Sequence, residues 1–185
     1  MEAFPEKMRR LTKASLAGRR IEIIEDDRAG QFEAGRVVLE SGRKLPADFV
    51  FLTWGIRPSR LFKDSGLPTG PDGGLLVNAY LQSVAYPQIF GGGDCISFQQ
   101  KPLGKVGVYA VRQNPILFHN LSAALNGDEM RAFDPGGDYL LIFNLGDGRG
   151  IFWKKQLVWQ GKLSFYLKDY IDRRFMKRFQ VSAEY

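Results

Sequence analysis

The pattern of apolar and polar residues predicts a run of short strands in the first third of the chain. Residues 20–25 alternate between the two kinds, and residues 30–34 and 36–40 form two further strand-like runs. Residues 47–55 are apolar nearly throughout, which is typical of a strand buried on both faces. Because tight turns join these runs, we expect a small antiparallel meander.

Helical spacing marks three further segments. Residues 5–17 begin with Pro5 in the first turn, and residues 106–126 form the clearest helix of the chain. Pro115 either bends this second helix or begins a new one there. Residues 162–180 predict an amphipathic helix, whose apolar row recurs every four residues at Leu163, Leu167, Ile171, Phe175 and Phe179.

The remaining strand-like segments are short and separated by turns. They comprise residues 75–77 and three runs near the C-terminal end, at 139–143, 150–153 and 156–159. The loop-rich stretch 56–75 lies between the first group of strands and the second. The order of these elements predicts an α/β chain, with a meander, C-terminal strands and a closing amphipathic helix.

Composition places the chain among ordinary globular proteins and excludes several classes. It has 185 residues, 44% of them hydrophobic and 25% charged, which suits one domain or two small ones. No apolar run is long enough to span a bilayer, and no signal peptide is visible. The one cysteine excludes an internal disulfide and fits a reducing compartment, so we expect a cytoplasmic protein. The one histidine argues against a His-rich metal site, and we expect no metal.

Positive charge gathers at the C-terminal end. Of the net charge of +6, residues 151–185 carry +5, because they hold 8 Lys and Arg against 3 Asp and Glu. A basic end suits phosphate, anionic lipid or an acidic partner, and it suits a solvated surface equally well. Nucleic acid is not expected, since the charge is confined to one helix and no nucleic-acid-binding motif accompanies it.

Two separated motifs carry the strongest chemical signal. Thr53-Trp54-Gly55-Ile56-Arg57-Pro58 ends the predicted buried strand, and Ile89-Phe90-Gly91-Gly92-Gly93-Asp94-Cys95 follows later. Between them stand residues 74–78 and 81–83, and after them come Ala110-Val111-Arg112-Gln113-Asn114-Pro115 and Asn120-Leu121. This series, in this order and spacing, resembles the pyridine nucleotide-disulfide oxidoreductase superfamily of FAD enzymes.

The resemblance implies an incomplete FAD/NAD(P)-binding, Rossmann-like fold. Residues 1–52 match the later part of an NAD(P)-binding domain, residues 53–137 the later part of an FAD-binding domain, and residues 138–185 a C-terminal interface region. Both Gly-x-Gly-x-x-Gly fingerprints of such an enzyme would lie upstream of residue 1, so we expect the C-terminal half of a flavoenzyme. Residues 167–176 look like one subgroup, close to type II NADH dehydrogenases, which includes copies fused to selenide, water dikinase.

The resemblance also implies cofactor-binding residues. Asp94, with Gly93 beside it, would accept hydrogen bonds from the ribityl hydroxyls of FAD, and Gly55 belongs to the first motif of the same site. The helix that begins near Val106, Gly107 and Val108 would direct its positive end at the flavin pyrimidine ring.

Other roles stay open at these positions. Arg112 and Gln113 would lie on the side where the family admits its electron acceptor. Asp94 can instead cap a turn, Cys95 fits packing better than redox chemistry, and His119 fits a surface or core position better than a catalytic base. No catalytic residue is assigned.

Two functions from different classes are therefore expected. The first is a fragment of an FAD-dependent oxidoreductase that takes hydride from NAD(P)H and passes electrons to a quinone or similar acceptor. By itself the fragment is expected to be inactive and to retain FAD weakly or not at all. The second is a non-catalytic interaction module, whose basic C-terminal helix contacts a partner or the inner face of a membrane. Bare sheet edges and apolar faces further predict a homodimer.

Overall fold

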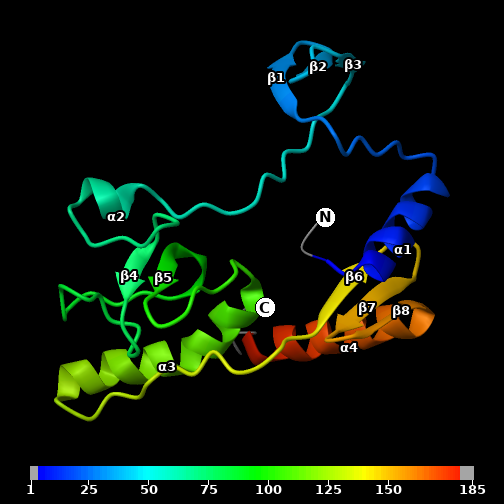
Figure 1. Ribbon diagram of the computed structural model, residues 1–185. Coiled ribbons are helices and arrows are strands. Elements are labelled where there is room, and N and C mark those ends of the chain that lie inside the picture. The colour runs from blue at the N-terminus through cyan, green and yellow to red at the C-terminus, as the bar shows by residue number, and fades with distance from the viewer. Residues whose placement is uncertain (1–3, 180–185) are drawn as a thin grey trace, which may run out of the picture. The chain divides into compact units, whose positions relative to one another are not determined.

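The computed structural model describes residues 4–179, and the chain divides into two compact units. One unit combines residues Met1–Phe51 with Asp138–Tyr185, and the other is the continuous stretch Leu52–Gly137 (Figure 1). The structure thus confirms a mixed α/β fold with several small sheets. The assignment of particular stretches to FAD and NAD(P) domains stays a prediction.

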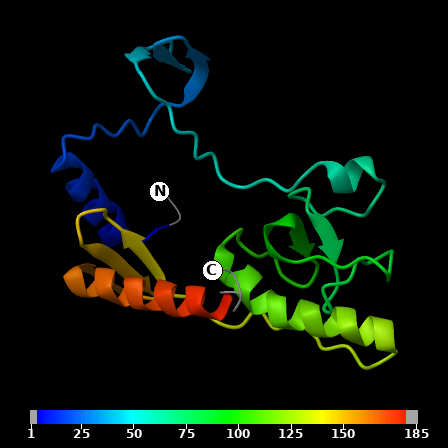
Figure 2. The ribbon, with the colours of Figure 1, turned by 180° about the vertical axis from the view of Figure 1, so that it is seen from behind.

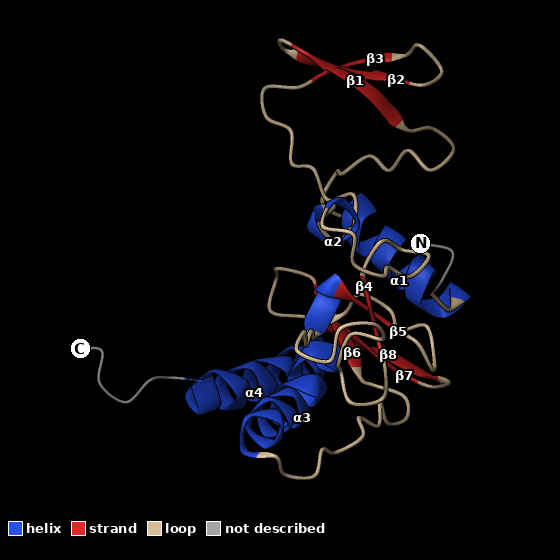
Figure 3. Ribbon diagram, turned by 90° about the vertical axis from the view of Figure 1, so that its left-hand side faces the viewer, coloured by secondary structure: helices blue, strands red, loops and turns tan. Residues whose placement is uncertain are grey.

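The predicted meander is present as a three-stranded antiparallel sheet in the order β1-β2-β3 (Figure 3). Its strands are β1 (Ala29–Glu33), β2 (Arg36–Leu39) and β3 (Lys44–Pro46). The first two strands were expected from the sequence, whereas β3 was not. The Asp27 carboxylate accepts hydrogen bonds from the backbone N–H and the hydroxyl of Ser41, which fixes the turn between β2 and β3.

Two predicted strands are wrong. Residues 20–25 and 47–55 have no regular secondary structure, and Phe49 and Phe51 are 86% and 90% exposed. A strand is defined by its hydrogen-bonded neighbours, and within residues 4–179 neither segment has a strand beside it. The apolar run at 47–55 meets the side-chain requirement of a buried strand without the partners that would bury it.

A second antiparallel sheet supports the larger part of the first unit. Strands β6 (Leu141–Asn144), β7 (Gly150–Lys154) and β8 (Leu157–Gly161) pair in that order. Helix α1 (Glu6–Ala17) packs on one face, where its fully buried Met8 contacts a cluster that includes Ile151 and Val158. Helix α4 (Lys162–Phe179) lies along the opposite face (Figure 2). These elements confirm the predicted C-terminal strands and the helices at both ends.

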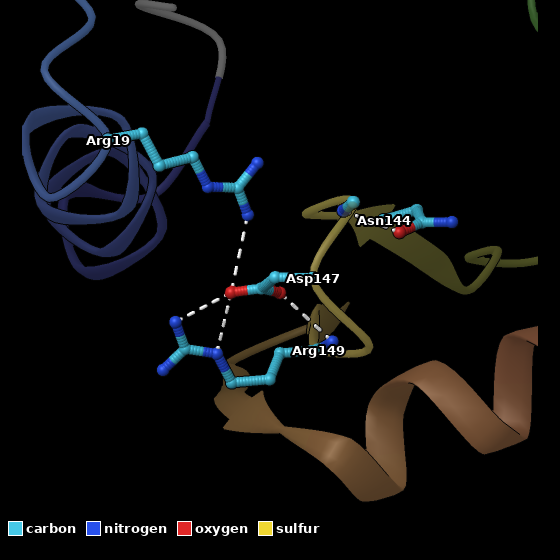
Figure 4. A network of polar contacts seen from close by, with 5 residues as sticks. Arg19, Asn144, Asp147 and Arg149 are labelled. Carbon is cyan, nitrogen blue, oxygen red and sulfur yellow. Dashed lines mark hydrogen bonds and ion pairs between the residues drawn. The ribbon is translucent and has the colours of Figure 1, made fainter.

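A carboxylate between two guanidinium groups joins α1 to the β6–β7 turn (Figure 4). Asp147 lies 3.2 Å from Arg19 and 2.6 Å from Arg149, and it also accepts the backbone N–H of Arg149. The hydrogen bond from Arg149, above all, lowers the pKa of Asp147 from 3.8 to about 2. The Gly146-Asp147-Gly148 segment is therefore the hairpin turn between β6 and β7, stabilised by ion pairs.

The second unit is built around two parallel strands. Strands β4 (Leu75–Val77) and β5 (Ile96–Phe98) pair in parallel, and the short helix α2 (Leu61–Asp64) and the 3-10 helix η1 (Gly93–Cys95) complete the loops around them. Helix α3 (Gly107–Asn126) runs beside this pair (Figure 1) and contains Pro115 without ending there. Its Ile116 and Leu117 pack against a core formed by Leu75, Val77, Leu81, Ile96, Phe98 and Phe133.

Glycines allow the turn before β4 to lie directly on β5. A Cβ added at Gly70 would stand 2.3 Å from the Cβ of Ser97, and one at Gly74 would stand 2.7 Å from the carbonyl carbon of Ile96. Such distances are far below van der Waals contact, so only glycine fits either position without movement of β5.

We expect Gly74→Ala to lower the free energy of unfolding of the second unit by about 1–3 kcal/mol, because the new methyl group meets backbone atoms that cannot turn aside. Gly104→Ala is the matched control, since a Cβ there meets nothing within 4 Å. It should be neutral or stabilising by up to about 1 kcal/mol. Urea denaturation measures both, and equal effects of the two substitutions would refute the close approach.

Candidate cofactor site

The glycine-rich segment after the loop from β4 makes a sharp turn into η1. Gly92 is extended, and Gly93 has a φ of +72°, a left-handed conformation that suits glycine. A Cβ at Gly91 would approach the Ile96 side chain to 2.7 Å. The segment is thus packed tightly against β5 and α3 by residues that have no side chain.

Gln113 fixes this turn to helix α3. Its side chain is 1% exposed, and its Oε1 accepts the backbone N–H of Gly93 at 2.5 Å. A Cβ built at Gly93 would stand 3.6 Å from the Cβ of Ala110, in the first turn of the helix. Gly93 and Asp94 are therefore held beside the beginning of α3.

Asp94 offers a carboxylate that the described protein does not use. The residue is half-buried in η1, and between residues 4 and 179 no hydrogen bond or ion pair reaches its side chain. An ionised carboxylate has two oxygens that can each accept hydrogen bonds. The carboxylate is thus suited to donors from a ligand, such as hydroxyl groups. The turn-capping alternative has no hydrogen bond to support it in this part of the chain.

Helix α3 begins without a side-chain cap. Val106 at the N-cap is extended and gives no side-chain hydrogen bond, and the first turn holds no acidic residue. The first N–H groups of a helix have no partner inside it, and they carry the positive end of its dipole. A Cβ at Gly107 would meet nothing within 4 Å, so space is open at this end. The backbone of Gly107 and Val108 can therefore donate to an electron-rich group.

The other predicted site residues lie elsewhere. Gly55 has a φ of +85° in a segment without regular structure, and a Cβ there meets nothing within 4 Å, so the structure does not bring it to Asp94. Arg112 donates to the backbone carbonyls of Pro135 and Gly137, at 3.2 Å for the latter. Gln113 is buried under Gly93. The acceptor-side roles of Arg112 and Gln113 stay predictions, and each side chain already has a structural task.

Two further anchors were not assigned from the sequence, although Asn120 belongs to one of the motifs that carry the resemblance. The buried Asn120 binds Tyr80 and Arg131 through their backbone groups and so fixes the segment that follows α3. Directly before α3, Lys105 forms an ion pair with Asp72 at 2.7 Å. Neither Asp72 nor Lys105 belongs to a motif, and only the close packing of the turn at 70–74 on β5 brings them together.

Comparison with known proteins identifies the family to which this chain belongs. The family model described as pyridine nucleotide-disulphide oxidoreductase matches residues 1–116, and the chain belongs to that family of FAD-dependent oxidoreductases. This finding confirms the family resemblance of the sequence, whereas the predicted subgroup is not distinguished by it.

The chain is similar to two curated proteins over most of its length. It is 29% identical over 139 residues to ferroptosis suppressor protein 1 of Taeniopygia guttata, a match that covers 73% of this chain and 36% of the relative. It is 26% identical over 164 residues to the FAD-dependent oxidoreductase FVFD30 of Flammulina velutipes, covering 85% of this chain and 49% of the relative. The chain therefore spans between about a third and a half of these relatives.

Solved structures support the fold. The sulfide:quinone oxidoreductase of Aquifex aeolicus has a TM-score of 0.69 at 18% identity, over 94% of this chain and 45% of that one. A NAD-dependent persulfide reductase of A. fulgidus has a TM-score of 0.64 at 24% identity, over 80% and 28% of the two chains. The described residues include no helix long and apolar enough to cross a membrane, and no cluster of His, Cys, Asp and Glu that could hold a metal ion.

We expect Gln113→Leu to lower the free energy of unfolding of the second unit by about 1–3 kcal/mol, because it leaves the Gly93 N–H without its acceptor. The Gly93 amide should also exchange faster with solvent than in the parent chain. Ser122→Ala is the control on the same helix, where the hydroxyl bonds only the carbonyl of Phe118. Urea denaturation and hydrogen exchange measure these effects, and an unchanged Gly93 amide would contradict the assigned anchor.

Proposed function

We propose that residues 91–94 and the beginning of α3 form the flavin-facing part of an FAD site. The observation that carries this proposal is the half-buried Asp94 carboxylate, which has no partner within residues 4–179 and is held beside the uncapped end of α3. An acceptor for hydroxyl groups and a set of N–H donors for an electron-rich ring thus stand together. Membership of an FAD-dependent family supports FAD as the group that fits.

Each part of the proposed site has a separate task. Asp94 would accept hydrogen bonds from ribityl hydroxyls, and the lack of side chains at Gly92 and Gly93 lets this turn lie close to α3. The N–H groups of Gly107 and Val108 stabilise negative charge on the reduced ring. FAD, when bound, supplies the acceptance of hydride and the transfer of electrons. The residues of this chain bind and orient the cofactor and adjust its electronic environment.

Membership of the pyridine nucleotide-disulphide oxidoreductase family supports a proposal for the electron donor and acceptor. We propose NAD(P)H as the donor, and a quinone or similar compound as the acceptor, in the manner of a type II NADH dehydrogenase-like enzyme. One structural relative bears quinone in its name, and the C-terminal sequence resembles the copies fused to selenide, water dikinase. Because the chain spans at most about half of its curated relatives, we expect no turnover from these residues alone.

The FAD proposal predicts measurable, weak binding by the chain. We expect Asp94→Ala to weaken FAD binding at least about tenfold, because a hydrogen bond to a charged group contributes about 1.5–3 kcal/mol. Flavin fluorescence titration measures the dissociation constant. Asp128→Ala is the control, since it removes an exposed carboxylate at the far end of α3. Equal affinities of the two variants, or no binding by the parent chain at millimolar FAD, would contradict the proposal.

A second candidate function is contact with a membrane surface through α4. Leu163, Tyr166 and Tyr170 are 71%, 63% and 59% exposed, and helical spacing places Arg174 and Lys177 on the same face. The acidic residues of the helix are paired within it, Asp169 with Arg173 and Asp172 with Lys168. An exposed aromatic row beside uncompensated positive charge is typical of helices that lie at a bilayer interface.

For the membrane candidate we expect Arg174→Glu/Lys177→Glu to abolish most binding to vesicles rich in anionic lipid. Co-sedimentation with phosphatidylserine vesicles measures the bound fraction. Lys154→Glu/Lys155→Glu makes the same charge change at the end of β7 and in the turn after it, and should bind like the parent chain. If both variants lose binding equally, attraction is by net charge alone and α4 is no membrane helix.

The predicted homodimer is a further proposal, which light scattering tests.

A further inference from the structure

An ion pair between a half-buried lysine and an exposed aspartate, whose side chain is 41% exposed, lies directly before the helix that begins the proposed FAD site. The Lys105 ammonium lies 2.7 Å from Asp72 Oδ2 and also donates to the backbone carbonyl of Ile96. The Lys105 side chain is only 16% exposed, which is unusual for lysine. The next residue, Val106, is the N-cap of α3. Lys105 therefore anchors the chain at the point where the helix starts.

The Asp72 carboxylate is the centre of a small network. Besides Lys105, it accepts the Ser97 hydroxyl and, at 3.0 Å, the backbone N–H of Gly74. Partial burial raises the pKa of Asp72, but the hydrogen bonds from Lys105, Ser97 and Gly74 outweigh burial and lower it to about 2. The carboxylate is thus charged at neutral pH, and its donors come from three different segments.

Other contacts also join these segments: β4, which follows the turn, pairs with β5, and Gln113 of α3 bonds Gly93. The turn at 70–74 lies on β5 because Gly70 and Gly74 have no side chain, and β5 follows directly on η1, which carries Asp94. Lys105 joins the beginning of α3 to the same turn and the same strand. The network therefore connects the two halves of the proposed site, Asp94 on one side and the N–H groups of Gly107 and Val108 on the other.

We propose that Asp72 and Lys105 are positioning residues that hold the first turn of α3 at a fixed place relative to Asp94. The inference rests on the proposed function, because it assigns this geometry to the FAD site. A long, flexible lysine loses considerable conformational freedom when two hydrogen-bond acceptors fix its ammonium group, as Asp72 and the Ile96 carbonyl do here. A helix that needed only a start signal would be served by Ser, Thr or Asp at the N-cap, and α3 has none of them. The ion pair fixes the helix start and leaves its N–H groups open.

The test uses Asp72→Asn and Lys105→Met in the full chain, followed by NMR. We expect hydrogen-exchange protection at Val106 and Tyr109 to fall at least about tenfold, with shifted resonances at Gly107 and Val108. Protection at Leu121 and Ala123, later in the same helix, should change less than about twofold. A purely stabilising role would lower all these amides together, so a uniform loss, or no loss at Val106 and Tyr109, would overturn the proposal.

Two further variants make the result specific. Lys105→Arg keeps the positive charge and should restore at least half of the lost protection, whereas failure to restore any would count against the ion pair. Asp147→Asn removes a carboxylate of equally low pKa from the other unit and should leave α3 unchanged. If Asp147→Asn changes Val106 and Tyr109 as much as Asp72→Asn does, the positioning role is refuted.

FAD titration separates this inference from the proposed function. Asp72→Asn should weaken FAD binding about threefold to tenfold while Asp94 is intact, and Asp94→Ala should weaken it without any change in exchange at Val106 and Tyr109. If the parent chain binds no FAD, the proposed function fails, and the exchange result alone decides whether the ion pair fixes the helix. If FAD binds the parent and Asp72→Asn equally, the positioning role is overturned and the proposed function stands.

Discussion

The hydrogen bond from the Gly93 N–H to the buried Gln113 side chain is the contact on which the candidate site depends. It joins a turn whose left-handed conformation favours glycine to the inner face of a long helix. The side-chain amide of Gln113 is buried, so water cannot replace the Gly93 N–H as its partner. Breaking this hydrogen bond is therefore costly. Asp94 follows Gly93 directly, so the same hydrogen bond also fixes the backbone of Asp94 beside α3. The Asp94 carboxylate and the uncapped beginning of α3 therefore lie close together.

Charge is arranged around this contact in a consistent way. Asp94 offers a hydrogen-bond acceptor, and the beginning of α3 offers donors. The opposite charges of Asp72 and Lys105 compensate each other directly before this helix. The lysine therefore adds little net field at the site while it anchors the chain. A site built in this manner can bind a cofactor that has hydroxyl groups at one point and an electron-rich ring at another. FAD has both, and the family to which the chain belongs uses it.

Sequence patterns predicted the local elements well and the long-range ones poorly. The spacing of apolar residues predicted helix α3 and strands β6 to β8, with bounds that agree with the structure to within a few residues. The motif around Asp94 was evident from its glycines. The strand expected at 47–55 is absent, because an apolar run defines a strand only where neighbours pair with it. The roles of Gln113 and Lys105 were also missed, since burial and partners such as Gly93 and Asp72 depend on packing between distant segments.

Mapping FAD onto the chain by NMR tests the central claim most directly. The account predicts that added FAD shifts the backbone resonances of residues 91–94 and 106–108 together, in one saturable process, and leaves those of the β6–β8 sheet unchanged. Loss of these shifts in Asp94→Ala would support the assigned acceptor. Shifts confined to another surface, or scattered over both units without saturation, would contradict the claim that these two segments form one cofactor site.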